Sequence, residues 1–466
     1  MTTTQEIIPY KREITSQERR FLFSPASFIS LVLRFRGHVT REAMEKAVEK
    51  LLVTYPLFGV RVEWNEERVK WSTTEGAAKV PVKVHPRVSD NSWMSVLNHE
   101  FAIPMRPSVG PLTRFVLVMG SDVSELIAMS HHMISDGRSL QFALREILLH
   151  LKDPGREPPV VREAPSHTPE IFPEGLAMGR FRSTMIGRIN KKWAKERILF
   201  DEEDLLNIWE ATWKNTHYVY EVMEFDEIET NSLVQVSRAN DVTLNSTILV
   251  AILRARIEAV GSYDRKARVA TAVDTRKRLR VDCSDAVGFY AGGSSVQLDY
   301  KENATFWENV RVYHKIVTKD LDENNVFGTV SDHFVLDQTL LDAMVISSIG
   351  DQIEPHQSRH EKLTEYSGRK ESLAAKFIAR MASNTPDIMS TNLGRIELPN
   401  DVPGIRVERA FFAPTSGMGF DIVLGVITVG GRLTITFNHL HGYVDGENMR
   451  KIRNKAEEIL RGLIHS

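Results

Sequence analysis

The clearest pattern along the chain is a short apolar run, a polar turn and then an apolar repeat at helical spacing. The run Glu125-Leu126-Ile127-Ala128-Met129 has the length and composition of a strand. Apolar residues then recur every three or four positions, which predicts a helix: Leu140, Ala143, Leu144, Ile147, Leu148 and Leu151. The turn between them reads Ser130-His131-His132-Met133-Ile134-Ser135-Asp136-Gly137.

The two histidines of this turn are predicted to point in opposite directions, because side chains alternate between the faces of a strand. His132 would share a face with Ser130 and Ala128, whose small side chains leave room for a cavity. His131 would share the other face with apolar neighbours, which favours the core. The pattern therefore predicts different roles for the two rings.

The same pattern recurs near the end of the chain. Residues 433–437 read as a strand, and they are followed by His441-Gly442-Tyr443-Val444-Asp445-Gly446. A helical repeat comes next, with one apolar face made by Met449, Ile452, Ala456, Ile459, Leu460 and Leu463. This repetition predicts a duplicated lobe, so we expect an α/β protein built as a pseudo-dimer of two similar halves.

A proline-rich segment divides the chain. Residues 152–175 hold six prolines and predict a semi-rigid connector between an N-terminal lobe, 1–151, and a C-terminal lobe, 176–466. Further helices are predicted over 41–52, 233–239, 245–259 and 305–321, and strands over 269–273 and 294–298. Residues 352–374 are polar and charged, which predicts a surface excursion with little core.

Bulk composition narrows the class of protein. The chain has 466 residues, 42% of them hydrophobic and 26% charged, as in ordinary globular proteins, and its length favours two lobes. A net charge of −2 argues against general nucleic-acid binding. The single cysteine, Cys283, allows no internal disulfide. Without a signal-like start or an apolar run of about 20 residues, the expected location is the cytoplasm, with no membrane span.

The chemistry that the residues favour is acyl transfer. A histidine suits the removal of a proton from a hydroxyl or amine because its ordinary pKa lies near neutrality. The sequence has no Gly-x-Ser-x-Gly elbow, phosphate-binding loop or dinucleotide fingerprint, and Cys283 has no activating neighbours, which argues against a covalent acyl-enzyme. No metal site is expected, because His131 and His132 diverge and no further ligand cluster is evident.

The motif His-His-x-x-x-Asp-Gly resembles the signature of the chloramphenicol acetyltransferase-like superfamily, which includes condensation domains, BAHD acyltransferases and stand-alone polyketide-associated acyltransferases. Flanking segments add to the resemblance: residues 55–61, 110–115, Val273-Asp274-Thr275-Arg276, residues 287–293 and 390–394. The last two are most similar to stand-alone, ester-forming members. The BAHD motif Asp-Phe-Gly-Trp-Gly is missing from the sequence.

The resemblance implies two similar lobes with a tunnel between them and His132 as general base in a ternary complex. It implies structural roles for His131, Gly137 and an Asp136–Arg276 pair, with Gly137 permitting a sharp turn. No bound cofactor is implied; acyl-CoA or a phosphopantetheine thioester on a carrier protein is the co-substrate, and a small molecule the acceptor. We expect a monomer.

Two further groups of residues are candidates for the site. Ser390, Asn392 and Ser416 are candidates for the oxyanion or the tunnel. The basic segment 180–197 is a candidate for docking the donor or, alternatively, a solvated helix face; its cations are Arg182, Arg188, Lys191, Lys192 and Lys195.

Several alternatives stay open at this stage. His441 and Asp445 are an alternative working pair. The protein is alternatively a free-standing amide-forming condensation domain, or a condensation-like module that recruits partners without catalysis. A glycerolipid acyltransferase is also considered, because His131 and Asp136 have the spacing of its His-x4-Asp pair and Phe172-Pro173-Glu174-Gly175 matches its second motif, although Leu176 then departs from it.

Overall fold

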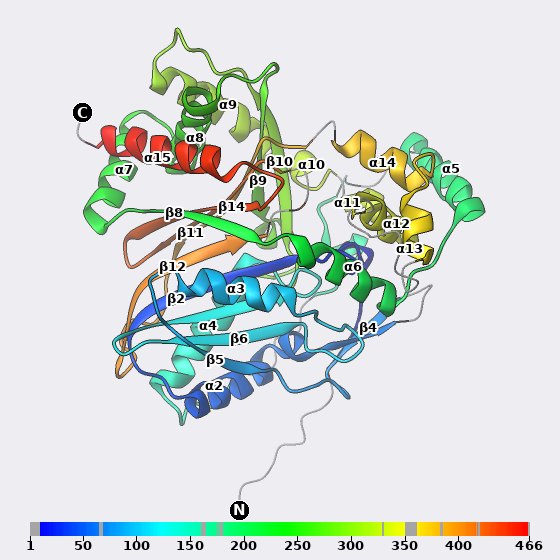
Figure 1. Ribbon diagram of the computed structural model, residues 1–466, viewed down its shortest axis with the longest axis horizontal. Helices are drawn as coiled ribbons and strands as arrows, with labels where there is room; N and C mark the ends of the chain where they lie inside the picture. Colours follow the sequence, from blue (N-terminus) through cyan, green and yellow to red (C-terminus); the bar gives the residue numbers. More distant parts are fainter. Residues whose placement is uncertain are drawn as a thin grey trace, which may run out of the picture.

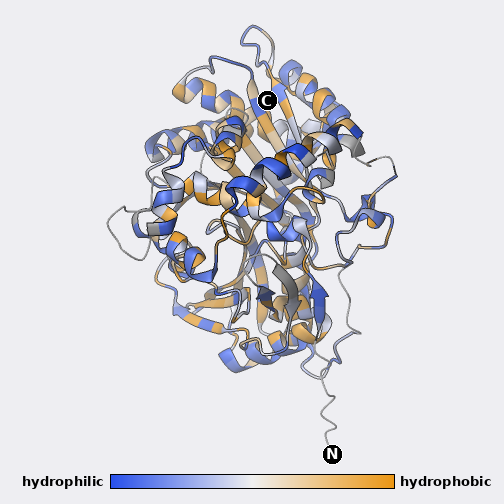
Figure 2. Cartoon of the chain, turned by 90° about the vertical axis from the view of Figure 1, so that its right-hand side faces the viewer, coloured by the Kyte–Doolittle hydropathy of each residue, from blue (hydrophilic) through white to orange (hydrophobic). Residues whose placement is uncertain are grey.

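The computed structural model describes residues 10–64, 69–159, 165–174, 176, 180–328, 330–349, 361–382, 385–415, 417 and 420–464. Two large sheets form the centres of two lobes, which lie one above the other in Figure 1. Helices in Figure 2 are striped with hydrophobic and hydrophilic residues, as expected where one helix face packs on a core. The two-lobed α/β architecture predicted from the sequence is confirmed.

The first lobe is built on a five-stranded sheet in the order β12-β2-β7-β6-β5. Its strands are β2 (Phe28–Gly37), β5 (Val82–Pro86), β6 (Thr113–Met119), β7 (Val123–His131) and β12 (Ile405–Pro414). Helices α2 (Arg41–Thr54) and α4 (Gly137–Lys152) pack on each other and on this sheet, and α3 (Ser92–Ala102) contacts β6 and β7. β7 is buried along almost its whole length, which explains the apolar run from Leu126 to Met129 at its centre.

The second lobe is built on a six-stranded sheet in the order β10-β9-β11-β13-β14-β8. Its strands are β8 (Tyr218–Glu224), β9 (Ala267–Asp274), β10 (Ala291–Leu298), β11 (Ile388–Ile396), β13 (Ile422–Val429) and β14 (Arg432–Leu440). Its helices are α7 (Glu227–Ala239), α8 (Leu244–Val260), α9 (Phe306–Asp320) and α15 (Gly446–Gly462). The pair α8 and α15 packs as α2 and α4 do in the first lobe, as the repeated sequence pattern predicts.

One strand departs from the predicted division at residue 176. β12 comes from the second half of the chain but pairs with β2 of the first sheet, from Ile405 opposite Gly37 to Pro414 opposite Ile29. It covers the backbone donors and acceptors that the edge of β2 would otherwise expose. β12 also packs on β13, where Gly425 approaches it so closely that a Cβ would lie 1.9 Å from the Phe412 carbonyl oxygen. The chain is therefore interlaced, and the boundaries themselves remain a prediction.

Shorter elements lie beside the lobes. A three-stranded sheet holds β1 (Lys11–Glu13), β4 (Val69–Thr73) and β3 (Arg61–Trp64). A helical group on the right of Figure 1 includes α5 (Arg180–Glu196), α6 (Glu202–Asn215), α11 (Val330–His333), α12 (Gln338–Ile349), α13 (Glu361–Ser367) and α14 (Leu373–Ala382). The remaining short elements are α1 (Ser16–Arg19), α10 (Glu323–Val326) and three 3₁₀ turns, Pro56–Gly59, Pro169–Ile171 and Arg276–Arg278.

The prediction of a surface excursion over 352–374 is wrong for the part that the structure describes. Leu363 and Tyr366 on α13 are 1% exposed, and Ala374 on α14 is fully buried. Their few apolar side chains point inward while the charged majority faces solvent, so average polarity concealed the buried stripe. Residues 351–360 lie outside the described ranges. Among the described residues, no helix is long and apolar enough to span a membrane.

Candidate active site

The histidine turn lies where β7 ends and α4 begins. β7 ends at His131, and His132 is the first residue of the turn, with its backbone N–H donating to the Ser27 carbonyl at 2.9 Å. Ser130 does not line a cavity as predicted, because it is fully buried and its hydroxyl is 3.1 Å from the Thr113 hydroxyl. The strand ends at His131, so the alternation of side chains along a strand does not determine the direction of His132.

His131 is part of the core. Its Nδ1 accepts a hydrogen bond from the Met133 backbone N–H at 3.2 Å, and its ring meets the Phe28 ring edge-on at 5.1 Å. Burial, together with the neighbouring His132, lowers the pKa of His131 to about 3. This ring is neutral at physiological pH and holds the turn in shape.

His132 has the geometry of a neutral base. Its Nδ1 lies 3.0 Å from the Ser135 carbonyl oxygen, and because a carbonyl only accepts, Nδ1 carries the proton and Nε2 keeps a free lone pair. The ring stacks on Phe21 at 5.0 Å and meets Phe289 edge-on at 5.4 Å. Burial lowers the pKa of His132 to about 4, against the opposing effects of the Ser135 carbonyl and Asp136. The ring is therefore unprotonated near neutral pH.

Asp136 and Arg276 are brought together across the two lobes. Arg276 donates from both terminal nitrogens to the Asp136 carboxylate, at 2.8 and 2.9 Å, in the bidentate geometry that suits this pair. The carboxylate also accepts from the Ser139 backbone N–H, the Ser139 hydroxyl and the Tyr290 N–H, each at 2.9 Å. Although burial opposes it, Arg276 keeps the pKa of Asp136 below its ordinary value. The carboxylate is held by Arg276, Ser139 and Tyr290 rather than by His132, and the ion pair fixes the lobes to each other.

Gly137 is required for close packing rather than for a turn conformation. It is the first residue of α4, and its φ lies outside the left-handed region. A Cβ at this position would lie 2.6 Å from Leu393 Cδ2 and 2.8 Å from Phe412 Cζ. The predicted clash exists, but it comes from side chains of β11 and β12 in the second half of the chain.

Comparison with known proteins supports this architecture at the level of the fold. No model of a known protein family matches the chain, and no curated protein matches its sequence. Solved structures do match. Polyketide synthase associated protein 5 from Mycobacterium tuberculosis aligns over 96% of this chain and 97% of its own, with a TM-score of 0.59 and 14% identity. The chain has the condensation-domain fold.

Two further structures extend the likeness. A trichothecene 15-O-acetyltransferase from Fusarium sporotrichioides aligns over 99% of this chain and 97% of its own, with a TM-score of 0.63 and 11% identity. The first condensation domain of the calcium-dependent antibiotic synthetase, in complex with a substrate analogue, aligns over 98% and 97%, with a TM-score of 0.63 and 11% identity. The fold that the motif resemblance implies is confirmed.

The second copy of the motif has a different environment in this condensation-domain fold. His441 is exposed and stacks on His217 at 4.6 Å, and Asp445 is an exposed N-cap that accepts from the backbone N–H groups of Glu447 and Asn448. The carboxylate of Asp445 therefore has a local role at α15. The enclosed, cross-lobe arrangement belongs to the first copy.

The candidates for the oxyanion or the tunnel are only partly placed. Ser390 is fully buried in β11, and its hydroxyl lacks a hydrogen-bond partner among the described residues. Asn392 donates to the Asn245 side chain at 2.8 Å and accepts from the Gly394 N–H at 2.7 Å, so its amide ties β11 to α8. Ser416 lies outside the described residues.

The basic segment forms helix α5. Arg182 forms an ion pair with Asp332 at 2.6 Å, whereas the other four cations are exposed: Arg188, Lys191, Lys192 and Lys195. Cys283 is buried, and burial raises its pKa to about 11, which leaves it protonated and unreactive.

The glycerolipid alternative loses its geometric basis. Asp136 bonds Arg276, Ser139 and Tyr290, while His131 bonds Met133, so the two residues of the required pair have other partners. Phe172 packs on Phe327, and Glu174 is exposed and 3.2 Å from Arg280. Gly175 lies outside the described residues.

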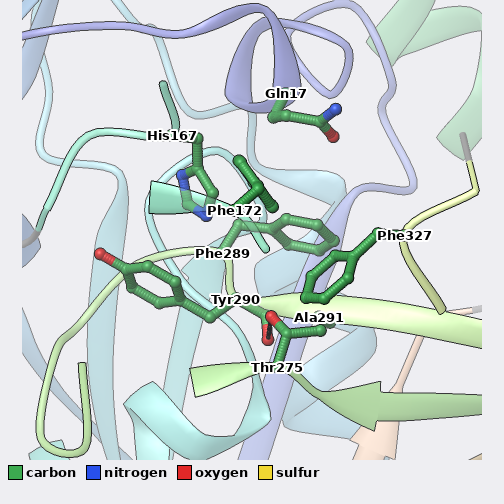
Figure 3. Close-up of a pocket in the computed structure, with 8 residues that line it drawn as sticks. All are labelled: Gln17, His167, Phe172, Thr275, Phe289, Tyr290, Ala291 and Phe327. Atoms are coloured by element: carbon green, nitrogen blue, oxygen red, sulfur yellow. Dashed lines mark hydrogen bonds between the residues drawn. The ribbon is translucent and has the colours of Figure 1, made fainter. Parts of the chain in front are cut away.

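A pocket beside His132 was not predicted. Its volume is about 10 Å³, which is room for about one water molecule, and it is partly open to solvent (Figure 3). Its lining residues are Gln17, His167, Phe172, Thr275, Phe289, Tyr290, Ala291 and Phe327. Phe289 connects the two features, because its ring lines the pocket and also contacts His132. Phe289 and Tyr290 belong to the segment 287–293 already singled out, whereas Gln17, His167 and Phe327 carry no such sequence signal.

Proposed function

We propose that the protein is an acyltransferase that moves an acyl group from a thioester to an alcohol or amine, with His132 as the general base. The observation that carries the proposal is the Nδ1 contact of His132 with the Ser135 carbonyl, because it leaves Nε2 free to take a proton. The condensation-domain fold supports the same chemistry.

The reaction needs no covalent enzyme intermediate. Nε2 of His132 takes the proton from the acceptor hydroxyl or amine while the acceptor oxygen or nitrogen attacks the thioester carbonyl carbon. The tetrahedral intermediate then expels the thiolate, which takes the proton back from the imidazolium. The products are an ester or amide and a free thiol. The low pKa of His132 favours this return of the proton, since the protonated ring is a strong acid.

Ester formation is the preferred outcome, because segments 287–293 and 390–394 are most similar to stand-alone ester-forming members. Two alternatives remain. The protein is a free-standing condensation domain that forms an amide, or it is a recruitment module without catalysis. The donor is acyl-CoA or an acyl-carrier protein. The exposed cations of α5 would bind the phosphates of acyl-CoA or the acidic surface of the acyl-carrier protein.

The test is a product survey with matched variants. Purified protein is incubated with a panel of acyl-CoA and acyl-carrier donors and of alcohols and amines, at low and high salt, and products are identified by mass spectrometry. His132→Ala should lower the rate about 10²–10⁴-fold, the usual contribution of a general base. His441→Ala, the matched change in the second copy, should leave turnover intact.

Each outcome has a distinct meaning. Loss of turnover in His441→Ala with full activity in His132→Ala, both folded by circular dichroism, would overturn the choice of site. Amide products alone would favour the condensation alternative. Binding of donors without turnover by the unmodified protein would favour recruitment.

A further inference from the structure

Arg20 lies beside the candidate base and uses the same aromatic rings. Its guanidinium carbon is 4.6 Å from the Phe21 ring centroid and 4.9 Å from that of Phe289. Both rings also contact His132, at 5.0 and 5.4 Å. The positive charge therefore lies next to the candidate base, across the two rings that both side chains contact.

Arg20 differs from its neighbours in having no counter-ion among the described residues. No carboxylate of the described residues forms an ion pair with Arg20, and its Nε is buried without a hydrogen-bond partner. The histidines that sense its charge are His132, His167 and His333. Burial is the main cause that lowers the pKa of each of them, to about 4, 4 and 3, and Arg20 lowers it further, so all three are neutral near pH 7.

The neighbouring arginines show how unusual this is. Arg12 forms an ion pair with Glu18, Arg19 lies 2.6 Å from Asp342, and Arg276 holds Asp136. Burial without a partner lowers the pKa of Arg20 to about 10, which still leaves it charged at neutral pH. The Arg20 side chain is partly buried, and a desolvated charge without a partner is costly, so a substrate anion would remove that cost.

We propose that Arg20 binds a carboxylate carried by one of the two reactants close to its reacting group. The proposal rests on the acyltransferase function and narrows its substrates to reactants with a carboxylate. The guanidinium fork matches the two oxygens of a carboxylate, and one positive charge balances one negative charge. The phosphates of coenzyme A fit less well, because the whole pantetheine arm separates them from the thioester.

Aromatic side chains surround the small pocket next to Phe289, which has room for about one water molecule. Phe172, Phe289, Tyr290 and Phe327 supply aromatic surfaces, and Gln17 and Thr275 supply two polar groups (Figure 3). An apolar group of the reactant would pack against these rings at the mouth of the pocket, and a hydroxy acid or amino acid is one source of such a carboxylate. An acyl group that ends in a carboxylate is the second source of the same chemistry.

The experiment compares reactants that differ only in the carboxylate. In the acceptor arm, calorimetry measures binding of hydroxybenzoates and 3-phenyllactate against the matching carboxamides. In the donor arm, malonyl-CoA is compared with acetyl-CoA. In at least one arm the unmodified protein should bind the carboxylate more tightly than its neutral partner. Arg20→Gln should lower the affinity for that carboxylate about 10–100-fold and leave the affinity for the neutral partner unchanged. Arg20→Lys should give an intermediate loss.

Two controls keep the result specific. Arg256 on α8 also stacks on an aromatic ring, that of Tyr263, at 4.0 Å. Arg256→Gln should therefore change neither the affinity for the carboxylate nor the affinity for its neutral partner. Arg20→Met should leave the melting temperature of the free protein unchanged or raise it, whereas Arg19→Met, which strands Asp342, should lower it. A fall with Arg20→Met equal to that of Arg19→Met would overturn the proposal.

Binding needs no turnover, so these results can be interpreted even if acyl transfer itself is refuted. Equal binding of carboxylates and their neutral partners in both arms would overturn the proposal. An equal loss of malonyl-CoA and acetyl-CoA binding in Arg20→Gln would assign the residue to the phosphates, and would also overturn it.

Discussion

Breaking the Asp136–Arg276 pair should cost more stability than any other single change at the turn. Both side chains are buried, and the carboxylate accepts five hydrogen bonds, two of them from Arg276. Removing one member of a buried pair typically costs about 3–5 kcal/mol, since the other charge is left uncompensated. Arg276→Met should lie near the lower figure, because Asp136 keeps three donors and the N-terminus of α4.

Asp136→Ala also removes the N-cap of α4, a loss of about 1 kcal/mol, but Arg276 keeps its ion pair with Asp274 at 3.1 Å, so the cost of this change should lie within the same range. The two changes should not add. Once either partner is absent, the second change removes no further attraction, so the double variant should be more stable than the sum predicts by about 2–3 kcal/mol. Urea denaturation followed by tryptophan fluorescence measures all four proteins.

The second copy of the motif supplies the control. Asp445→Ala removes an exposed cap that accepts from Glu447 and Asn448, so it should cost only about 1 kcal/mol. Losses for Asp136→Ala and Arg276→Met that add within about 0.5 kcal/mol would refute the coupling. A cost for Asp445→Ala as large as that for Asp136→Ala would refute the distinction between the two copies.

Two more changes follow from the same region. Gly137→Ala should lower the free energy of unfolding by about 1–3 kcal/mol, because its Cβ would lie 2.6 Å from Leu393; Gly446→Ala, with its nearest atom at 3.8 Å, should have little effect in the same urea titration. Acidification should destabilise the protein. In the folded protein the pKa of His131 is about 3 and that of His132 is about 4, whereas both rings bind a proton below about pH 6.5 in the unfolded chain. Between these pH values, each histidine therefore lowers the free energy of unfolding by at most about 1.4 kcal/mol for each pH unit of acidification. Melting curves from pH 7 to 5 should show this slope, and His131→Asn should flatten it. An unchanged slope in this variant would mean that the protons taken up on unfolding bind to other groups.

Local patterns predicted the elements that hold the histidine turn. The run before His131 became β7, and the helical repeat after Gly137 became α4, because burial on both faces and amphipathic spacing leave direct traces in the sequence. Arg276 was matched through the segment 273–276, and the structure places it on Asp136. Such residues can be found in the sequence because they recur in recognisable strings.

The rest depends on contacts between residues far apart in the chain. β12 pairs with β2 although more than 360 residues separate them in the chain. Only the edge of β2 in the folded sheet shows that a further strand belongs there, and no local pattern predicts it. Arg20 and Phe289 meet through the fold, and no short-range pattern marks an arginine as unpaired. The alternation argument also did not extend to His132, because the strand ends at His131.

The two copies of the motif show that the sequence string alone does not make an active site. Both begin a helix with an aspartate cap, so local sequence determines the turn in each case. What differs is the surface packed against them. β11, β12 and Arg276 pack against the first copy, and burial leaves His132 neutral, whereas His441 and Asp445 remain at the surface. A duplicated fold can therefore keep one enclosed copy and one exposed copy of the same string, and the interlaced strand β12 belongs to the enclosed one.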